Sequence, residues 1–258
     1  MSSIHPTAVI HPEAELEDGV AVGPYSIVGS GVRIGKGTQI ASHVVIEGTT
    51  VIGQNCRIFS FASVGQVPQD LKFHGEKSEL ILGDNNVLRE FVTFHRGTEG
   101  GGRQTLIGND NFFMAYAHVA HDCRIGNFVI MANAATLAGH VTIEDHSIVG
   151  AFSGIHQFCR VGKYGFVGGY SVVTKDVLPF SKTVGNRAHC YGINSVGLRR
   201  KGFSTDKIQH IKHAFRLLLQ SKLNTSQALE AMEKEVESTE EITYLIQFIK
   251  TSSRGIIK

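Results

Sequence analysis

The 258-residue sequence has little excess charge, few cysteines and no long apolar run. A formal net charge of +2 creates no whole-protein field that would attract nucleic acid or a membrane surface. No apolar stretch is long enough to span a bilayer, and no secretory apolar region follows Met1. We therefore expect a cytoplasmic protein without nucleic-acid partners and without stable membrane insertion.

The four cysteines are too few and too regularly placed for a disulfide framework. Cys56, Cys123 and Cys159 occupy equivalent small positions of the repeat described next. Buried packing thiols in a reducing compartment are therefore favoured over disulfides, while Cys190 has no assignment.

What the sequence does contain is an internal repeat of six residues. Between residues 107 and 173 an aliphatic residue, Phe or Met returns at every sixth position, and residues 4–64 follow the same pattern. We call this residue the leader of its hexad; a small residue usually follows four positions later. On an α-helix successive leaders would point in three directions, and a strand of sixty residues does not occur in a globular domain. Short strands joined by corners remain, so the repeat predicts a solenoid of parallel strands.

Glycines mark the expected corners of the solenoid. The residue after the leader is glycine at Gly108, Gly126, Gly150, Gly162 and Gly168. Glycine adopts left-handed or tight backbone conformations at the least cost. We therefore expect corners with a left-handed or tight backbone at these positions.

Two insertions interrupt the repeat at about 66–80 and 95–106. Continuing the count would bury Asp70 and Glu76 as leaders, so the first insertion must leave the coil; the second is glycine-rich and shifts the phase by one residue. Long loops on a rigid repeat often carry function. The polar residues of the first loop are ligand candidates, with an ordinary solvated loop as the alternative: Gln69, Asp70, Lys72 and His74.

The repeat region is expected to span residues 1–184, followed by a linker and a small helical domain over 185–258. Ser204 or Thr205 caps a first amphipathic helix, Thr225 or Ser226 a second, and Thr239 a third. Because these helices are too few to fold well alone, we expect them to pack on the last coil.

Several of the thirteen histidines fall in the central repeat and outside its inward positions, among them His118, His121, His140 and His156. If three hexads close one coil, residues 18 apart lie about 4.8 Å apart, so these rings should form a column along one edge. Two chemistries fit such a column. The spacing His118-x-x-His121 is compatible with the zinc site of a hydrase. Alternatively one imidazole acts as a general base, with Asp122 orienting the ring of His121. Histidines that merely fit the corners remain the structural alternative.

Several ordered motifs, together with the repeat and both loops, resemble the UDP-N-acetylglucosamine 3-O-acyltransferase family of lipid A synthesis over nearly the whole chain. The motifs are Gln69-Asp70-Leu71-Lys72, His95-Arg96-Gly97, Ala117-His118-Val119-Ala120-His121-Asp122-Cys123, Leu137-Ala138-Gly139-His140, Ile155-His156-Gln157-Phe158 and Gly197-Leu198-Arg199-Arg200-Lys201-Gly202. The resemblance implies a left-handed parallel β-helix of hexapeptide repeats with a C-terminal helical domain. It also implies a homotrimer with active sites between subunits.

The resemblance further implies a role for particular residues. His121 would be the general base for attack of the sugar 3-hydroxyl on a 3-hydroxyacyl thioester of acyl-carrier protein, Asp122 would orient it, and the Gly139 N–H would stabilise the oxyanion. No metal or cofactor is expected, because a thioester is already activated. The remaining matches would contact the sugar nucleotide or the acyl and pantetheine groups: Gln69, Asp70, Lys72, His95, His118, His140, His156, Gln157, Gly169, Asn194 and Arg200.

Two positions depart from the family pattern, and three other functions compete with it. Arg187 stands where a histidine is expected and Val196 where a glutamate is expected, which puts the nucleoside end of the site in question.

An N-acyltransferase with a separate nucleotide-binding domain does not fit, because hexads begin at Ile4. A 3-amino sugar acceptor, a zinc hydrase and a non-catalytic scaffold remain alternatives. A basic patch would meet the acidic carrier protein: Arg199, Arg200, Lys201, Lys207 and Lys212.

Overall fold

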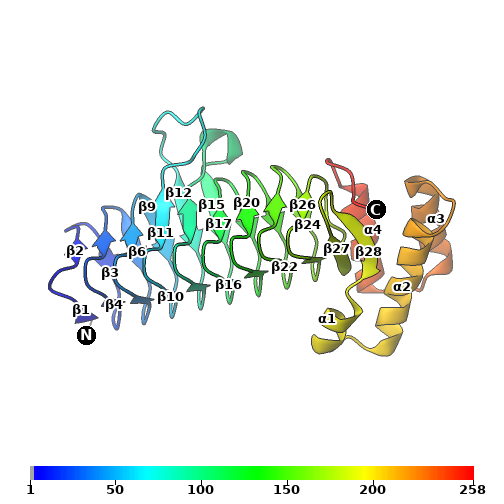
Figure 1. Ribbon diagram of the computed structural model, residues 1–258, viewed down its shortest axis with the longest axis horizontal. Helices are drawn as coiled ribbons and strands as arrows, with labels where there is room; N and C mark the ends of the chain where they lie inside the picture. Colours follow the sequence, from blue (N-terminus) through cyan, green and yellow to red (C-terminus); the bar gives the residue numbers. More distant parts are fainter. Residues whose placement is uncertain (1–2) are drawn as a thin grey trace.

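The computed structural model describes residues 3–258, which form a long three-sided solenoid with helices at one end (Figure 1). Over these residues the first sheet has 11 strands: β1 (Ser3–Ile4), β4 (Ala21–Val22), β7 (Gln39–Ile40), β10 (Arg57–Ile58), β13 (Val87–Leu88), β16 (Phe112–Phe113), β19 (Ile130–Met131), β22 (Ile148–Val149), β25 (Phe166–Val167), β27 (Ser181–Val184) and β28 (His189–Ile193). The second sheet has 9 strands: β2 (Val9–Ile10), β5 (Ile27–Val28), β8 (Val45–Ile46), β11 (Ser63–Gln66), β14 (Thr93–His95), β17 (His118–Val119), β20 (Thr136–Leu137), β23 (Gly154–Ile155) and β26 (Val172–Val173). The third sheet has 8 strands: β3 (Glu15–Leu16), β6 (Val32–Ile34), β9 (Thr49–Ile52), β12 (Glu79–Leu82), β15 (Gln104–Ile107), β18 (Arg124–Ile125), β21 (Thr142–Ile143) and β24 (Arg160–Val161).

The strand register confirms that three hexads close one coil. Val119 pairs in parallel with Leu137, and Ile125 with Ile143, so paired residues are 18 apart. Leaders such as Ile46 and Val149 are fully buried and line the interior of the solenoid. Cys56, Cys123 and Cys159 are buried free thiols, as predicted.

The solenoid continues for one more partial coil than the hexad count indicated. The run of leaders ends at Val173, but β27 pairs in parallel with β25, and β28 then returns antiparallel to β27. Proline lacks an N–H, yet it fits here because Pro179 lies at a corner, packed against Gly162.

The five glycines that follow the leaders do mark tight corners, but they are not the left-handed residues. Positive φ falls two residues later, on non-glycine residues such as Asp110 (58°), Phe128 (57°) and Tyr164 (58°). Glycine after the leader serves a different purpose. A Cβ on Gly108 would lie 2.7 Å from the carbonyl oxygen of Gly126 on the next coil. The close approach of successive coils therefore selects glycine there.

The C-terminal region contains α1 (Ser195–Arg200), α2 (Thr205–Leu219), α3 (Thr225–Glu235) and α4 (Glu240–Lys250). Ser204 and Thr239 cap α2 and α4 as predicted. The cap of α3 is Asn224, not Thr225 or Ser226, because Asn224 and Gln227 form a reciprocal capping box. The short helix α1, capped by Asn194, was not predicted.

The helices pack on the last coil, as predicted. The buried side chains of Leu178 and Phe180 belong to the same hydrophobic cluster as the inner faces of α2, α3 and α4. The hydroxyl of Tyr244 on α4 donates to Glu144 and accepts from the Lys163 N–H (3.0 Å) of the solenoid. Within residues 3–258, the helices are too short or too polar to cross a membrane.

Candidate active site

The candidate residues lie along one edge of the solenoid, where the chain passes from the second sheet to the third; we call it the loop edge. It carries the loop 67–78 between β11 and β12, the loop 96–103 between β14 and β15 with its short 3-10 helix Glu99–Gly101, and the corners 120–123, 138–141 and 156–159. Both loops project from the same side of the solenoid (Figure 1). They are slightly shorter than the predicted insertions, because β12 and β15 begin before the leaders.

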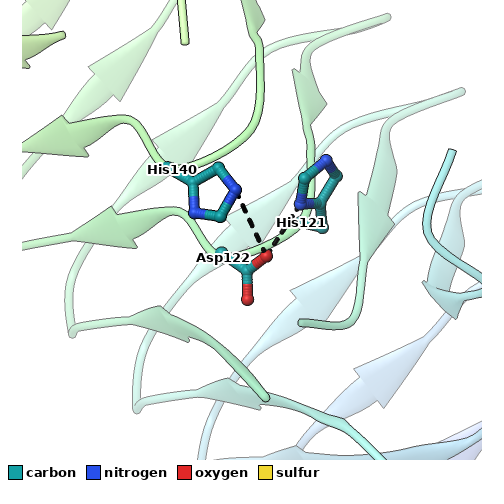
Figure 2. Close-up of side chains that lie close together, drawn as sticks. All are labelled: His121, Asp122 and His140. Carbon is teal, nitrogen blue, oxygen red and sulfur yellow. Dashed lines mark hydrogen bonds and ion pairs between the residues drawn. The ribbon is translucent and has the colours of Figure 1, made fainter. Parts of the chain in front are cut away.

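The centre of the loop edge is the pair His121 and Asp122 (Figure 2). His121 Nδ1 lies 2.7 Å from Asp122 Oδ2. Thr98 holds the same carboxylate with its N–H on Oδ1 (2.8 Å) and its hydroxyl on Oδ2 (2.6 Å). Asp122 is only 5% exposed. The second loop therefore covers the carboxylate and fixes its orientation toward His121.

The charge state of Asp122 follows from these contacts. Burial alone would raise the pKa of this carboxyl, but hydrogen bonds from His121 and Thr98 outweigh burial and hold the pKa below its ordinary value. An ionised carboxylate only accepts hydrogen bonds, so His121 Nδ1 is the donor. The second ring nitrogen of His121, Nε2, then carries a free lone pair.

Sequence reasoning missed Thr98 and Gly101 as supports of this pair. A Cβ on Gly101 would lie 1.9 Å from Asp122 Cγ, so only glycine lets the loop approach the carboxylate. The glycine-rich composition of the second loop was visible in the sequence, but the residue that it would contact was not.

Gly139 lies on the next coil against the imidazole of His121. A Cβ there would be 2.5 Å from His121 Cε1 and 2.7 Å from Nε2. The carbonyl of Gly139 accepts from the Phe158 N–H (3.3 Å), whereas its own N–H has no acceptor among residues 3–258. A residue with a free backbone donor therefore packs against the ring of the candidate base.

His140 completes the cluster. Its ring lies edge-on to His121 at 5.1 Å between centroids, and its Nε2 is 3.8 Å from Asp122 Oδ2. Burial lowers the pKa of His140, and the negative charge of Asp122 offsets only part of this effect. His140 is therefore neutral at neutral pH and offers a hydrogen-bonding nitrogen rather than a charge.

The predicted column of four histidines is wrong in detail. The stacked positions 18 residues apart are Asp122, His140 and Phe158, with 4.5 Å between the last two rings. His121 precedes that column by one residue, and His156 precedes Phe158 by two. Spacings of 19 and 16 therefore place these rings beside the column rather than in it.

His118 forms a separate pair with His95. His118 Nδ1 is 2.7 Å from the Thr93 hydroxyl, and the two rings meet edge-on at 5.1 Å. Burial, with smaller effects from His118 and His121, lowers the pKa of His95 to about 4, and burial also lowers that of His118. Both rings are neutral at neutral pH.

The grouping that could hold a metal differs from the predicted His118-x-x-His121 pair. Within residues 3–258, the only such group consists of His121, Asp122 and His140, whose ligand atoms lie within 4.8 Å of one another. His118 does not belong to this group.

The two loops, His140 and Phe158 line a cavity of about 750 Å³. Asp70 and Lys72 line it together with Thr98, His140 and Phe158. The Lys72 cation, the neutral imidazole of His140 and three carboxylates, Asp70, Glu76 and Glu99, thus line one space large enough for part of a sugar nucleotide. Gln69 is exposed and lies outside this lining.

Four other predicted site residues lie away from the cavity. Gln157 is exposed on the corner after β23, and Gly169 is exposed on a different edge, next to the Ala151 carbonyl. Asn194 caps α1 through the Gly197 N–H (3.2 Å), and Arg200 is exposed at the end of that helix. In Figure 1, α1 lies on the side of the molecule opposite the projecting loops. One chain therefore does not bring Asn194 and Arg200 to His121.

A hexapeptide solenoid that carries a carboxylate-oriented histidine beside a free backbone N–H defines a hexapeptide-repeat acyltransferase. Family models agree: residues 13–48 match the bacterial transferase hexapeptide, and residues 176–257 match domain 2 of UDP-N-acetylglucosamine O-acyltransferase. The acyl-[acyl-carrier-protein]–UDP-N-acetylglucosamine O-acyltransferases of Thermodesulfovibrio yellowstonii and Myxococcus xanthus are each 50% identical to this chain over the full length of both. The chain belongs to this acyltransferase family.

Solved structures give the same result. The UDP-N-acetylglucosamine acyltransferase of Bacteroides fragilis superimposes with a TM-score of 0.97 at 43% identity, covering 98% of this chain and 99% of that one. The enzyme of the same name from Campylobacter jejuni gives a TM-score of 0.93 at 39% identity, over 99% of each chain. The left-handed parallel β-helix with a C-terminal helical region is thereby confirmed.

Proposed function

We propose that this acyltransferase moves a 3-hydroxyacyl group from acyl-carrier protein to the 3-hydroxyl of UDP-N-acetylglucosamine, the first step of lipid A biosynthesis, with His121 as the general base. The single observation that carries the residue assignment is the His121–Asp122 contact of 2.7 Å, made by a buried carboxylate that Thr98 also holds. This contact commits Nδ1 as a donor and leaves Nε2 as an acceptor. The reaction belongs to the cytoplasm, where the carrier protein supplies the donor.

The chemical steps follow from this arrangement. Nε2 of His121 takes the proton of the sugar 3-hydroxyl as its oxygen attacks the thioester carbonyl, and Asp122 stabilises the imidazolium that forms. The carbonyl oxygen becomes an oxyanion within reach of the Gly139 N–H. Collapse of the tetrahedral intermediate breaks the carbon–sulfur bond, and the imidazolium returns its proton to the departing thiolate. No cofactor enters these steps, because the thioester is already activated.

Substrate binding is assigned to the residues around the cavity. Lys72 supplies a positive charge for a phosphate of the nucleotide, and Asp70 and His140 supply hydrogen-bonding groups for the sugar. His95, His118 and Gln69 extend the same edge. His156, Gln157 and Gly169 are assigned to the acyl and pantetheine side.

A homotrimer with sites between subunits would resolve the remote position of α1. The helix α1, which Asn194 caps and Arg200 ends, lies on the side of the molecule opposite the projecting loops (Figure 1). A neighbouring copy could place them at the nucleotide end of a cavity that one chain leaves open. Size measurement in solution, together with restoration of activity on mixing inactive Asn194 and His121 variants, would test this arrangement.

The function is tested by incubating the protein with 3-hydroxyacyl-acyl-carrier protein and UDP-N-acetylglucosamine and identifying the product by mass. Acylation of oxygen at position 3 supports the proposal, and absence of acyl transfer rejects it. A 3-amino analogue of the sugar in competition decides between the two acceptors. Because His121, Asp122 and His140 could also hold a metal, the assay is repeated with a chelator: loss of activity that zinc restores would favour metal chemistry.

A further inference from the structure

The last residues of the chain return to the solenoid and lie at the end of the loop edge. Asp176, fully buried in the last coil, accepts from the Arg160 N–H (2.8 Å) and from the Ser252 hydroxyl (2.7 Å). Its backbone N–H donates to the Gly255 carbonyl (2.8 Å), and its carbonyl accepts from the Ile257 N–H (2.9 Å). The segment 252–257 is therefore held from both sides by one buried residue.

Arg254 lies in the middle of this docked segment and points to the candidate site. Its Nη2 is 3.3 Å from Nδ1 of His156, at the corner that also carries Phe158 and Cys159. Phe158 in turn stacks on His140 of the catalytic cluster. The tail thus contacts the site through one side chain.

Two contacts at His156 Nδ1 require opposite positions of the ring proton. The Gln157 carbonyl lies 3.2 Å away and can only accept, so that contact needs a proton on Nδ1. The guanidinium of Arg254 can only donate, so its contact needs a lone pair on Nδ1. A neutral imidazole satisfies one of these partners at a time. Since hydrogen bonds from a charged donor are the stronger ones, the contact with Arg254 prevails.

We propose that Arg254 is a positioning residue that selects the His156 tautomer with its proton on Nε2, so that this nitrogen donates a hydrogen bond to a substrate oxygen. Without Arg254, the proton moves to Nδ1 and is donated to the Gln157 carbonyl, and Nε2 becomes an acceptor. The inference rests on the proposed function in so far as His156 contacts the substrate. It makes the docked tail of the helical domain part of the reaction site.

The tautomer is tested directly by NMR of the full-length enzyme with ¹⁵N-labelled histidine, with His156→Gln used to assign the ring signals. Arg254→Met removes the donor but keeps an apolar stem of similar reach. We expect the wild type to carry its proton on Nε2, Arg254→Met to carry it on Nδ1, and Arg254→Lys to restore the wild-type pattern. A wild-type proton on Nδ1, or the same tautomer in wild type and Arg254→Met, would overturn the proposal.

Kinetics provide a second measurement. Arg254→Met should lower kcat/KM about 3- to 10-fold, which is the effect of one lost hydrogen bond. In a His156→Ala background the same substitution should have no further effect, because Arg254 acts through that ring. Lys258→Met removes an exposed cation from the same tail without touching His156 and should leave kcat/KM unchanged.

The outcomes separate this inference from the proposed function. A decrease of kcat/KM that persists in the His156→Ala background, or no decrease in the wild-type background, would overturn the role of Arg254. If the wild type transfers no acyl group at all, the proposed function fails, while the NMR measurement still decides whether Arg254 sets the tautomer. Thermal unfolding of each variant checks that the fold is retained, and the Asp176 contacts that hold the tail do not involve the Arg254 side chain.

Discussion

Two edges of this solenoid use the same backbone position for different purposes. On the edge between the first and second sheets, the left-handed corner residues form an exposed stack with 4.8–5.2 Å between neighbouring ring centroids; we call it the aromatic edge. Its members are Tyr25, His43, Phe61, Phe91 and Tyr116. On the loop edge, the corresponding position holds Asp122, His140 and Phe158, with φ between 61° and 65°.

The comparison shows what makes one edge reactive. The repeat brings side chains 18 residues apart into contact on both edges, so proximity alone does not distinguish them. The two edges differ in their residue types and in their burial by an inserted loop. Tyr116 is 60% exposed, whereas Asp122 is 5% exposed beneath the loop 96–103. A buried carboxylate interacts strongly with a neighbouring imidazole because water does not screen the contact. The inserted loop, rather than the repeat, therefore creates the candidate site.

The largest expected effect contrasts the two edges directly. His121→Ala on the loop edge should lower turnover by roughly 10²–10⁴ without unfolding the protein, because a general base contributes about that much. Tyr116→Ala on the aromatic edge should leave turnover unchanged and lower only the melting temperature, since stacked rings contribute stability. Steady-state kinetics and thermal unfolding of both variants provide the measurement. Near-normal turnover in a folded His121→Ala protein would remove this residue from the mechanism.

The second effect concerns acid stability of the loop edge. The pKa of His95 is lowered to about 4 in the folded protein from about 6.5 when unfolded, because the ring is 4% exposed. Between pH 4 and pH 6.5 the unfolded state therefore binds more protons at His95 than the folded state does. The stability contributed by the neutral ring is complete above pH 6.5 and is lost as the pH falls toward 4. From pH 7 to pH 5 this loss amounts to about 2 kcal/mol.

Urea unfolding at pH 7 and pH 5, at one protein concentration, measures the loss for wild type and His95→Phe. The phenyl ring is flat like the imidazole, although somewhat larger, and does not titrate, so the decrease in unfolding free energy should be smaller in the variant by about the stated amount. An equal decrease in both proteins would show that other groups cause the acid sensitivity.

The coil that both edges share was predictable from the sequence, whereas the contacts that the inserted loop makes at the site were not. Leaders such as Val119 and Leu137 predicted the coil, since burial of every sixth side chain admits few other folds. The site depended on contacts outside the repeat. Thr98 reaches Asp122 only because the second loop folds back over the edge, and no spacing encodes that path.

Helix ends show the same limit. Ser204 and Thr239 were predicted as caps because an apolar face follows each directly. Asn224 was missed because Thr225 and Ser226 are acceptable caps as well, and the choice depended on a reciprocal bond with Gln227. The short helix α1 buries only Leu198, which is too little for a periodic signal.

The third effect concerns binding of acyl-carrier protein, which we expect on the helical domain rather than on either edge of the solenoid. Arg199→Glu with Arg200→Glu should raise the KM for acyl-carrier protein by roughly 10-fold at low salt and less at high salt, because exposed charges are screened. Lys207, which was predicted to belong to the same patch, pairs with Glu241 at 2.6 Å, so Lys207→Gln should change the KM for the carrier less. A carrier KM that is unchanged across ionic strength would leave the patch as solvated surface.

The smallest effect is expected on the aromatic edge, and it would show whether that edge also contributes to function. Gly168 and Gly169 both lie there, and neither has a positive φ, so the corner itself does not require glycine. A Cβ on Gly168 would lie 2.7 Å from the Val184 side chain, which explains that residue by packing. Gly169 is exposed, and a Cβ there would contact only the Ala151 backbone, with the carbonyl oxygen at 3.2 Å. Packing therefore leaves Gly169 unexplained.

Family resemblance assigns Gly169 to the end of the acyl groove and implies a donor of about fourteen carbons. Gly169→Met should then block the groove and shift the preference toward donors several carbons shorter. Each methylene that is no longer buried costs about 0.8 kcal/mol, a factor of about four in relative kcat/KM. Competition between long and short hydroxyacyl-carrier proteins measures this shift. Ser42→Met places the same side chain at the equivalent corner of an early coil and should leave the preference unchanged. If Gly169→Met also keeps the long donor, the acyl chain lies elsewhere and the aromatic edge serves stability alone.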